Sequence, residues 1–149
     1  MKIKIYVQID INIDHINKFE KLIANELPSR YREFLAKNNI CSVDPKNFTL
    51  PNGDPCSQIK MIYGFKKFNE NDKQYLSYTM DWIFNIYTDR IHKDYLAIAG
   101  DFFGNCICIG LSEDRRGEIY FWDHEAMENE HNLTLLDNDF DSFLDSLHK

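Results

Sequence analysis

Three short apolar segments follow one another between residues 95 and 123, and they limit the fold more than any other feature of the chain. They read YLAIA (95–99), NCICIGL (105–111) and EIYFWD (118–123). The connections between them, GDFFGN and SEDRRG, contain glycine, which adopts the positive φ angles that tight antiparallel turns need. The sequence therefore predicts an antiparallel meander, and the alternation within CICIG and IYFW favours a sheet with one face covered.

The IYFW run also predicts which side chains pack together. Alternation along a strand places Tyr120 and Trp122 on one face and Ile119 and Phe121 on the other. At least one of these pairs must be buried, and we expect Ile119 and Phe121 to be the deeper pair. Trp122 is then interpreted as a packing residue rather than a ligand platform.

Four cysteines, Cys41, Cys56, Cys106 and Cys108, are too few and too irregularly spaced for a disulfide framework, so reduced thiols are expected. Cys106 and Cys108 share one face of a predicted strand, but a zinc site needs a second close pair of ligands. They are interpreted as small buried apolar residues.

The remaining segments complete a single α+β domain. Strict alternation predicts a half-buried strand at 2–13, and QIKMIYGF predicts another at 58–65, after a long irregular connection over 40–58. Helical periodicity predicts four helices. The first starts at a cap on Asp14, and the second covers 27–39, with Pro28 in its first turn and Asn38-Asn39 at its end. The third covers 76–91, and the last, near the carboxyl end, is capped by Asp137 to Asp139. The predicted fold is one domain over 1–149, an antiparallel sheet with helices packed mainly on one side.

Charge and composition exclude several classes of function. The net charge of −7 argues against a nucleic-acid binder, because such proteins need clustered Lys and Arg, and it favours a basic partner. No apolar run approaches the roughly 18 residues that span a bilayer. The amino terminus does not read as a secretory signal, so we expect a cytoplasmic protein.

The segment HEAMENEH (124–131) is the most suggestive of metal chemistry. A zinc-protease helix places histidines four residues apart, but Glu128 stands where the second histidine belongs, and His131 lies seven residues from His124. An acidic surface loop is the favoured interpretation. A small metal-dependent hydrolase that uses His124, Glu125, Glu128 and His131 remains an alternative.

Five motifs in order carry a family resemblance. LPSRYREFLAKNN, a mid-chain strand that ends in YGF, YLAIAGDFFGNCICIGL, RGEIYFWDHE and NLTLLDNDFDSFLDSL together resemble the SUKH superfamily, the domain of the Smi/Knr cell-wall regulators of fungi and their bacterial relatives. The resemblance covers about residues 14–148. The strand at 2–13 is an addition to the family pattern, and NNICSVDP replaces the glycine that commonly follows the second helix of the family.

This resemblance implies a non-catalytic protein without a cofactor. Bacterial members are mainly immunity proteins that bind and block a toxin domain, often a nuclease, whereas fungal members are regulatory scaffolds, and both types stay open as alternatives. We expect a cognate toxin, basic and of the nuclease type, to be the partner. The candidate partner-binding residues are the carboxylates at strand ends and turns: Asp101, Asp114, Asp123, Glu125, Glu128 and Glu130.

Overall fold

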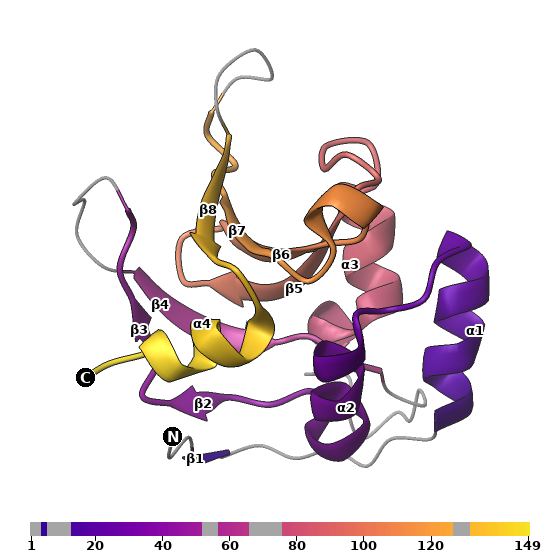
Figure 1. The fold of residues 1–149 in the computed structure, drawn as a ribbon, viewed down its shortest axis with the longest axis horizontal. Coiled ribbons are helices and arrows are strands. Elements are labelled where there is room, and N and C mark those ends of the chain that lie inside the picture. The colour runs from indigo at the N-terminus through magenta and orange to yellow at the C-terminus, as the bar shows by residue number, and fades with distance from the viewer. Residues whose placement is uncertain (1–3, 6–12, 52–56, 66–75, 127–131) are drawn as a thin grey trace.

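The computed structural model describes residues 4–5, 13–51, 57–65, 76–126 and 132–149. In this part of the chain, six strands form one antiparallel sheet in which strand order follows chain order (Figure 1). The strands are β3 (Asn47–Phe48), β4 (Ser57–Ile62), β5 (Tyr95–Asp101), β6 (Cys106–Gly110), β7 (Ile119–Trp122) and β8 (Leu133–Asp137). The predicted α+β class and the antiparallel meander are confirmed.

The helices of the described residues are α1 (Ile13–Ile23), α2 (Ser29–Asn38), α3 (Met80–Tyr87) and α4 (Phe140–Ser146). The helix predicted over 27–39 is confirmed as α2, with Pro28 as its N-cap rather than in its first turn. Asn39, whose φ is 53°, is its C-cap. Asp139 caps α4, because its side chain accepts a hydrogen bond from the Ser142 amide. The predicted cap at Asp14 is wrong, since α1 begins one residue earlier and includes Asp14 in its first turn.

The first fifty residues differ most from the prediction. Of the strand predicted at 2–13, the structure describes Lys4–Ile5 as β1, which pairs with β2 (Val43–Asp44), and Ile13 is already helical. Residues 6–12 lie outside the described residues. The connection predicted to be irregular contains β2 and β3, which are two residues long and therefore have no readable period.

The central strands are buried on both faces, so the prediction of one covered face is wrong for β6 and β7. Cys106 pairs with Trp122 and Cys108 with Tyr120, which places these four residues on one face. That face, here called the cysteine face, is covered by α3, whose Tyr87 ring lies 5.3 Å from the Trp122 ring.

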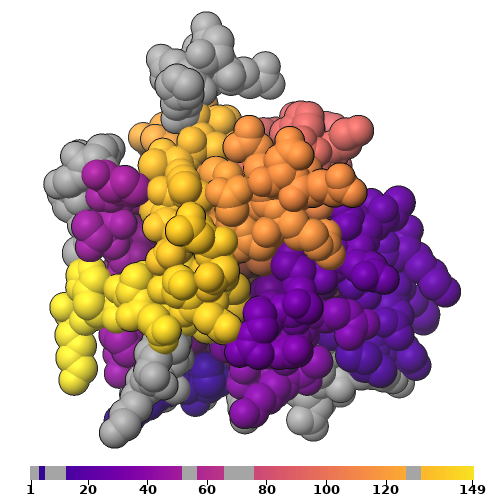
Figure 2. Space-filling view, in the orientation of Figure 1, coloured from indigo at the N-terminus to yellow at the C-terminus, as the bar shows by residue number. Residues whose placement is uncertain are grey.

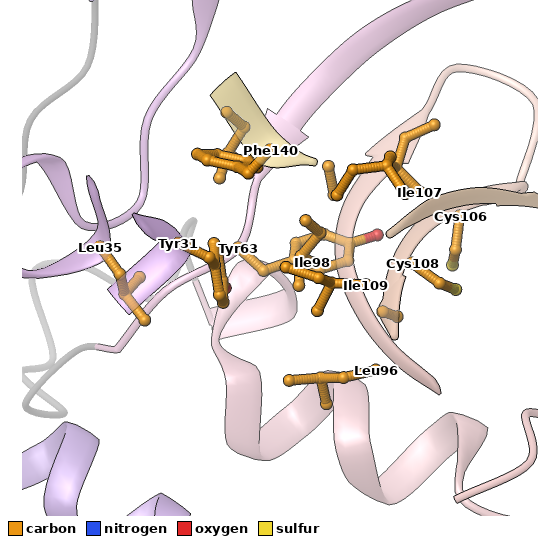
Figure 3. Packing of buried hydrophobic residues seen from close by; sticks show 14 of the residues in the cluster. Tyr31, Leu35, Tyr63, Leu96, Ile98, Cys106, Ile107, Cys108, Ile109 and Phe140 are labelled. Carbon is orange, nitrogen blue, oxygen red and sulfur yellow. The ribbon is translucent and has the colours of Figure 1, made fainter. Parts of the chain in front are cut away.

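The opposite face packs on β3 and α4. The Phe48 ring lies 5.9 Å from Phe121 and 6.1 Å from Phe143 of α4. Figure 3 shows Ile107 and Ile109 pointing away from the two cysteines. Trp122 is a packing residue, 2% exposed. The predicted difference in depth between the two pairs is not found: Ile119 and Phe121 are 0% and 8% exposed, and Tyr120 and Trp122 are 6% and 2% exposed. Both faces are buried because α3 covers the cysteine face, and alternation along one strand does not predict a helix on that side.

Segments far apart in the sequence also contact one another at two places in the fold. α4 and α2 lie side by side (Figure 2), joined by the Tyr31 and Phe140 rings and by the ion pair between Arg30 and Asp141. At the edge of the sheet, β3 is bridged by the end of the described chain. Asn47 and His148 exchange two backbone hydrogen bonds, of 3.2 and 3.0 Å.

Candidate partner-binding surface

The turn between β5 and β6 is organised around a buried carboxylate. Asp101 is 6% exposed. Its Oδ1 accepts hydrogen bonds from the amides of Phe103 (2.8 Å) and Asn105 (2.9 Å). Its Oδ2 accepts from the Ser57 hydroxyl (3.0 Å) and the Asn105 side chain (2.9 Å). Gly104 supplies the positive φ of 88° that closes the turn.

A second turn, after β7, packs against the first. The Asn105 Oδ1 atom accepts a hydrogen bond from the His124 amide (3.2 Å) and lies 2.6 Å from His124 Nδ1. A Cβ added at Gly104 would meet the His124 ring at 3.2 Å, so the ring lies directly over this glycine. Asp123 holds the second turn by accepting from the Glu125 amide (3.0 Å). The two turns are therefore one rigid unit at one end of the sheet.

This unit presents two large apolar side chains to solvent. Phe103 is 70% exposed and Phe102 is 51% exposed. The ammonium groups of Lys46 and Lys60 lie 5.6 and 5.9 Å from the centre of the Phe102 ring, within the range of cation–π contacts. The Glu125 side chain is 83% exposed, and its Oε1 atom lies 4.0 Å from His124 Nε2.

We name this region the sheet-end surface. It comprises Phe102, Phe103, Asp123, His124 and Glu125. Exposed aromatic residues dominate the energetics of many protein interfaces, and a rigid support lowers the entropy lost on binding. The arrangement is suited to recognition of another protein.

The candidate carboxylates are distributed over more than one region. Asp123 and Glu125 lie together on the sheet-end surface, whereas Asp101 is buried beneath it and is engaged by the turn. Asp114 is exposed in a short 3-10 turn (Glu113–Arg115) between β6 and β7, at the opposite end of the sheet. Glu128 and Glu130 lie outside the described residues.

Phe102 and Phe103 are the residues that the sequence analysis missed as candidates. GDFFGN was interpreted only as a hairpin turn. The available signal was its composition, because turns favour Gly, Asn, Asp, Pro and Ser, and two adjacent phenylalanines serve no purpose in forming one.

The cysteine face is not a reactive site. Burial raises the pKa of Cys106 to about 11, an effect partly offset by hydrogen bonds from Tyr87 and Tyr63, and burial raises the pKa of Cys108 well above its ordinary value. Burial also raises the pKa of Cys41 to about 12. These thiols are protonated at neutral pH and are not nucleophiles, in agreement with their interpretation as buried apolar residues.

Part of the segment considered for metal chemistry, 124–126, lies within the described residues. No group of three or more His, Cys, Asp or Glu side chains is arranged there to hold an ion, and His124 is engaged by Asn105. Glu128 and His131 lie outside that part of the chain. Among the helices that the structure describes, none has the length and apolar character needed to cross a bilayer.

Two comparisons with known proteins bear on this surface. The family described as SMI1 / KNR4 (SUKH-1) matches residues 10–146, which include both turns and nearly all of the chain. The chain is also 29% identical, over 159 aligned residues, to the SPbeta prophage-derived uncharacterized protein YokK of Bacillus subtilis (strain 168). That alignment covers 95% of this chain and 77% of the relative.

Proposed function

Because the chain belongs to the SMI1/KNR4 (SUKH-1) family, we propose that it is a bacterial immunity protein, which binds a cognate toxin in the cytoplasm and blocks it without chemistry of its own. The observation that carries the proposal is the sheet-end surface. There a network of hydrogen bonds joins the turn that exposes Phe102 and Phe103 to the turn that carries the carboxylates of Asp123 and Glu125.

The proposed partner is a basic toxin domain of the nuclease type. The net charge of −7 attracts a basic protein at long range, and Asp123 and Glu125 place negative charge on the turn that packs against the turn of Phe102 and Phe103. On docking, Phe103 fills an apolar pocket of the toxin while the carboxylates occupy positions that the toxin uses for substrate phosphates. Occlusion of the toxin's substrate site is sufficient for immunity.

Gene neighbourhood is the first test. A toxin gene immediately beside the gene for this protein supports the proposal, whereas a place within a metabolic operon contradicts it. Co-production with that toxin should protect cells, and the purified toxin domain should bind the wild-type protein. Absence of both protection and binding would show that the protein has another function.

A matched pair of charge reversals then tests the surface. Glu125→Lys removes an exposed carboxylate from the sheet-end surface, and Asp114→Lys makes the same charge change at the opposite end of the sheet. We expect Glu125→Lys to weaken toxin binding at least about tenfold, mainly through the association rate, and Asp114→Lys to change it less than about twofold.

Salt dependence provides a second readout of the same pair. Raising the salt concentration should slow association of the wild-type protein by about an order of magnitude and affect dissociation less. Glu125→Lys should have the shallower salt dependence. Equal affinities and equal salt slopes for the two variants would show that toxin binds elsewhere, even if protection by the wild-type protein is intact.

A further inference from the structure

A second feature, remote from the sheet-end surface, is an apolar cavity of about 210 Å³ between α1, α3 and β5. Its floor is formed by Ile83, Leu96, Ala97 and Leu111, which are all buried. Figure 3 shows Leu96 directed toward α3. The half-buried Ile23 of α1 and Phe84 of α3 form its side walls, and the exposed Leu22, Thr88 and Lys93 lie at its mouth.

The cavity lies between the last residues of α1 and the second half of α3. Farther along the two helices, the rings of Phe19 and Phe84 close the space between them, with ring centres 5.7 Å apart. Beyond these rings α1 ends at Ile23, and the chain turns away through Ala24, whose φ is 55°. The space beyond the two rings is the cavity, which Ile23 of α1 and Tyr87 of α3 also line.

Hydrogen bonds connect the segment that follows α1 to the connection between β6 and β7. The Asn25 side chain donates to the Leu111 carbonyl (3.3 Å) and accepts from Arg116 Nη1 (3.1 Å). Arg116 also donates to the carbonyls of Glu26 (2.6 Å) and Leu111 (3.3 Å). The connection between β6 and β7 is thus hydrogen-bonded to the segment that follows α1, at the rim of the cavity.

The lining determines what kind of molecule fits. A designed apolar cavity of about 150 Å³, lined by Leu, Ile and Phe side chains, binds benzene, so a lining of this type at 210 Å³ has room for a substituted ring. Thr88 offers a hydroxyl group at the mouth, and Lys93 offers a positive charge. An apolar interior with a few polar groups at one end is typical of small-molecule sites.

We propose that this cavity binds a small apolar molecule, a single aromatic ring or a short alkyl chain, whose polar or anionic end faces Lys93. The site is independent of toxin binding. It lies between α1, α3 and β5 and shares no residue with the sheet-end surface.

Two fluorinated probes test the site in the full-length protein: fluorobenzene, which is purely apolar, and 4-fluorobenzoate, which adds a carboxylate. Fluorine NMR line broadening should show saturable binding of both probes to the wild-type protein. Ala97→Leu fills the floor and should weaken both probes at least tenfold. Thr88→Trp covers the mouth from an exposed position that does not affect the core, and it should do the same.

Matched controls separate the cavity from general surface effects. Asp89→Trp adds the same ring at the neighbouring exposed residue, which does not line the cavity, and should leave both affinities within about twofold. Lys93→Glu should weaken 4-fluorobenzoate at least tenfold and leave fluorobenzene nearly unchanged. Lys37→Glu, the same charge change on α2, should alter neither.

The proposal is overturned if neither probe binds the wild-type protein saturably. It is also overturned if Ala97→Leu and Thr88→Trp, both folded, bind the probes as the wild-type protein does. Equal loss of both probes in Lys93→Glu would contradict the assigned position of the anionic end.

Discussion

At the scale of single residues, the carboxylate of Asp101 supports the exposed pair Phe102 and Phe103. Replacement by Ala removes the acceptor for four hydrogen bonds and leaves their donors unpaired, among them the buried hydroxyl of Ser57. We expect Asp101→Ala to lower the free energy of unfolding by about 2–3 kcal/mol, since a hydrogen bond to a charged group contributes about 1.5–3 kcal/mol. Urea denaturation measures the change. The exposed Asp114→Ala should shift stability by less than about 0.5 kcal/mol, and equal midpoints for the two variants would contradict this role.

The role of Asp101 was only partly readable from the sequence. A carboxylate after a strand suggested a surface position, whereas the structure buries it inside the turn that follows. The missed signal is local chemistry, because Asp side chains commonly accept hydrogen bonds from the backbone two residues further along, as Asp101 does from Phe103. The interpretation of Cys106 and Cys108 needed only their alternation with isoleucine, and it is confirmed.

Burial of the thiols predicts that the protein loses stability at alkaline pH. Burial raises the pKa of Cys106 from 9.0 to about 11, so between these values the unfolded chain loses a proton that the folded chain retains. Stability from this group is complete below pH 9 and is lost as pH rises toward about 11. Thermal unfolding of Cys106→Ala should therefore show a shallower fall over this range than that of the wild-type protein. Identical slopes would show that Cys106 does not titrate as described.

At the scale of elements, β7 contributes to packing on both of its faces. We expect Phe121→Ala and Trp122→Ala each to lower the free energy of unfolding by about 3–5 kcal/mol, the usual range for a buried aromatic residue. Phe121 would lose its contacts with Phe48, and Trp122 its contacts with Tyr87. Leu135→Ala in β8, where the side chain is 41% exposed, should cost about 1 kcal/mol or less. A denaturant midpoint unchanged by Phe121→Ala would contradict the strand register.

The sequence predicted best those elements whose apolar residues repeat regularly and whose ends carry recognisable capping or turn residues. α2 and α4 have apolar stripes and recognisable ends, and β5 to β7 alternate between glycine-containing turns. β8 was missed because LTLLD combines three leucines without strict alternation. The second cover on β7 was missed because it comes from Tyr87, far along the chain.

At the scale of the whole molecule, chain order in the sheet decides which connections meet. Each strand reverses direction, so the turns after β5 and β7 lie at one end, and the turn after β6 lies at the other. The sequence predicted the family, which is confirmed, and it predicted acidic residues at strand ends. The sequence analysis grouped Asp114 with Asp123, because the order of turns along the chain does not by itself show at which end of the sheet each turn lies.

The bridge between Asn47 and His148 has a consequence for solubility. β3 is an outer strand of the sheet, and an outer strand with unpaired backbone groups is a template for another copy of the same chain. His148→Pro removes the amide that donates to the Asn47 carbonyl, so we expect concentration-dependent self-association, visible by light scattering, whereas His148→Ala, which retains the amide, should stay as dispersed as the wild-type protein. If both variants scatter alike, the bridge does not protect this edge. If only the proline variant associates, two hydrogen bonds near the carboxyl end are what keep copies of this protein from joining edge to edge.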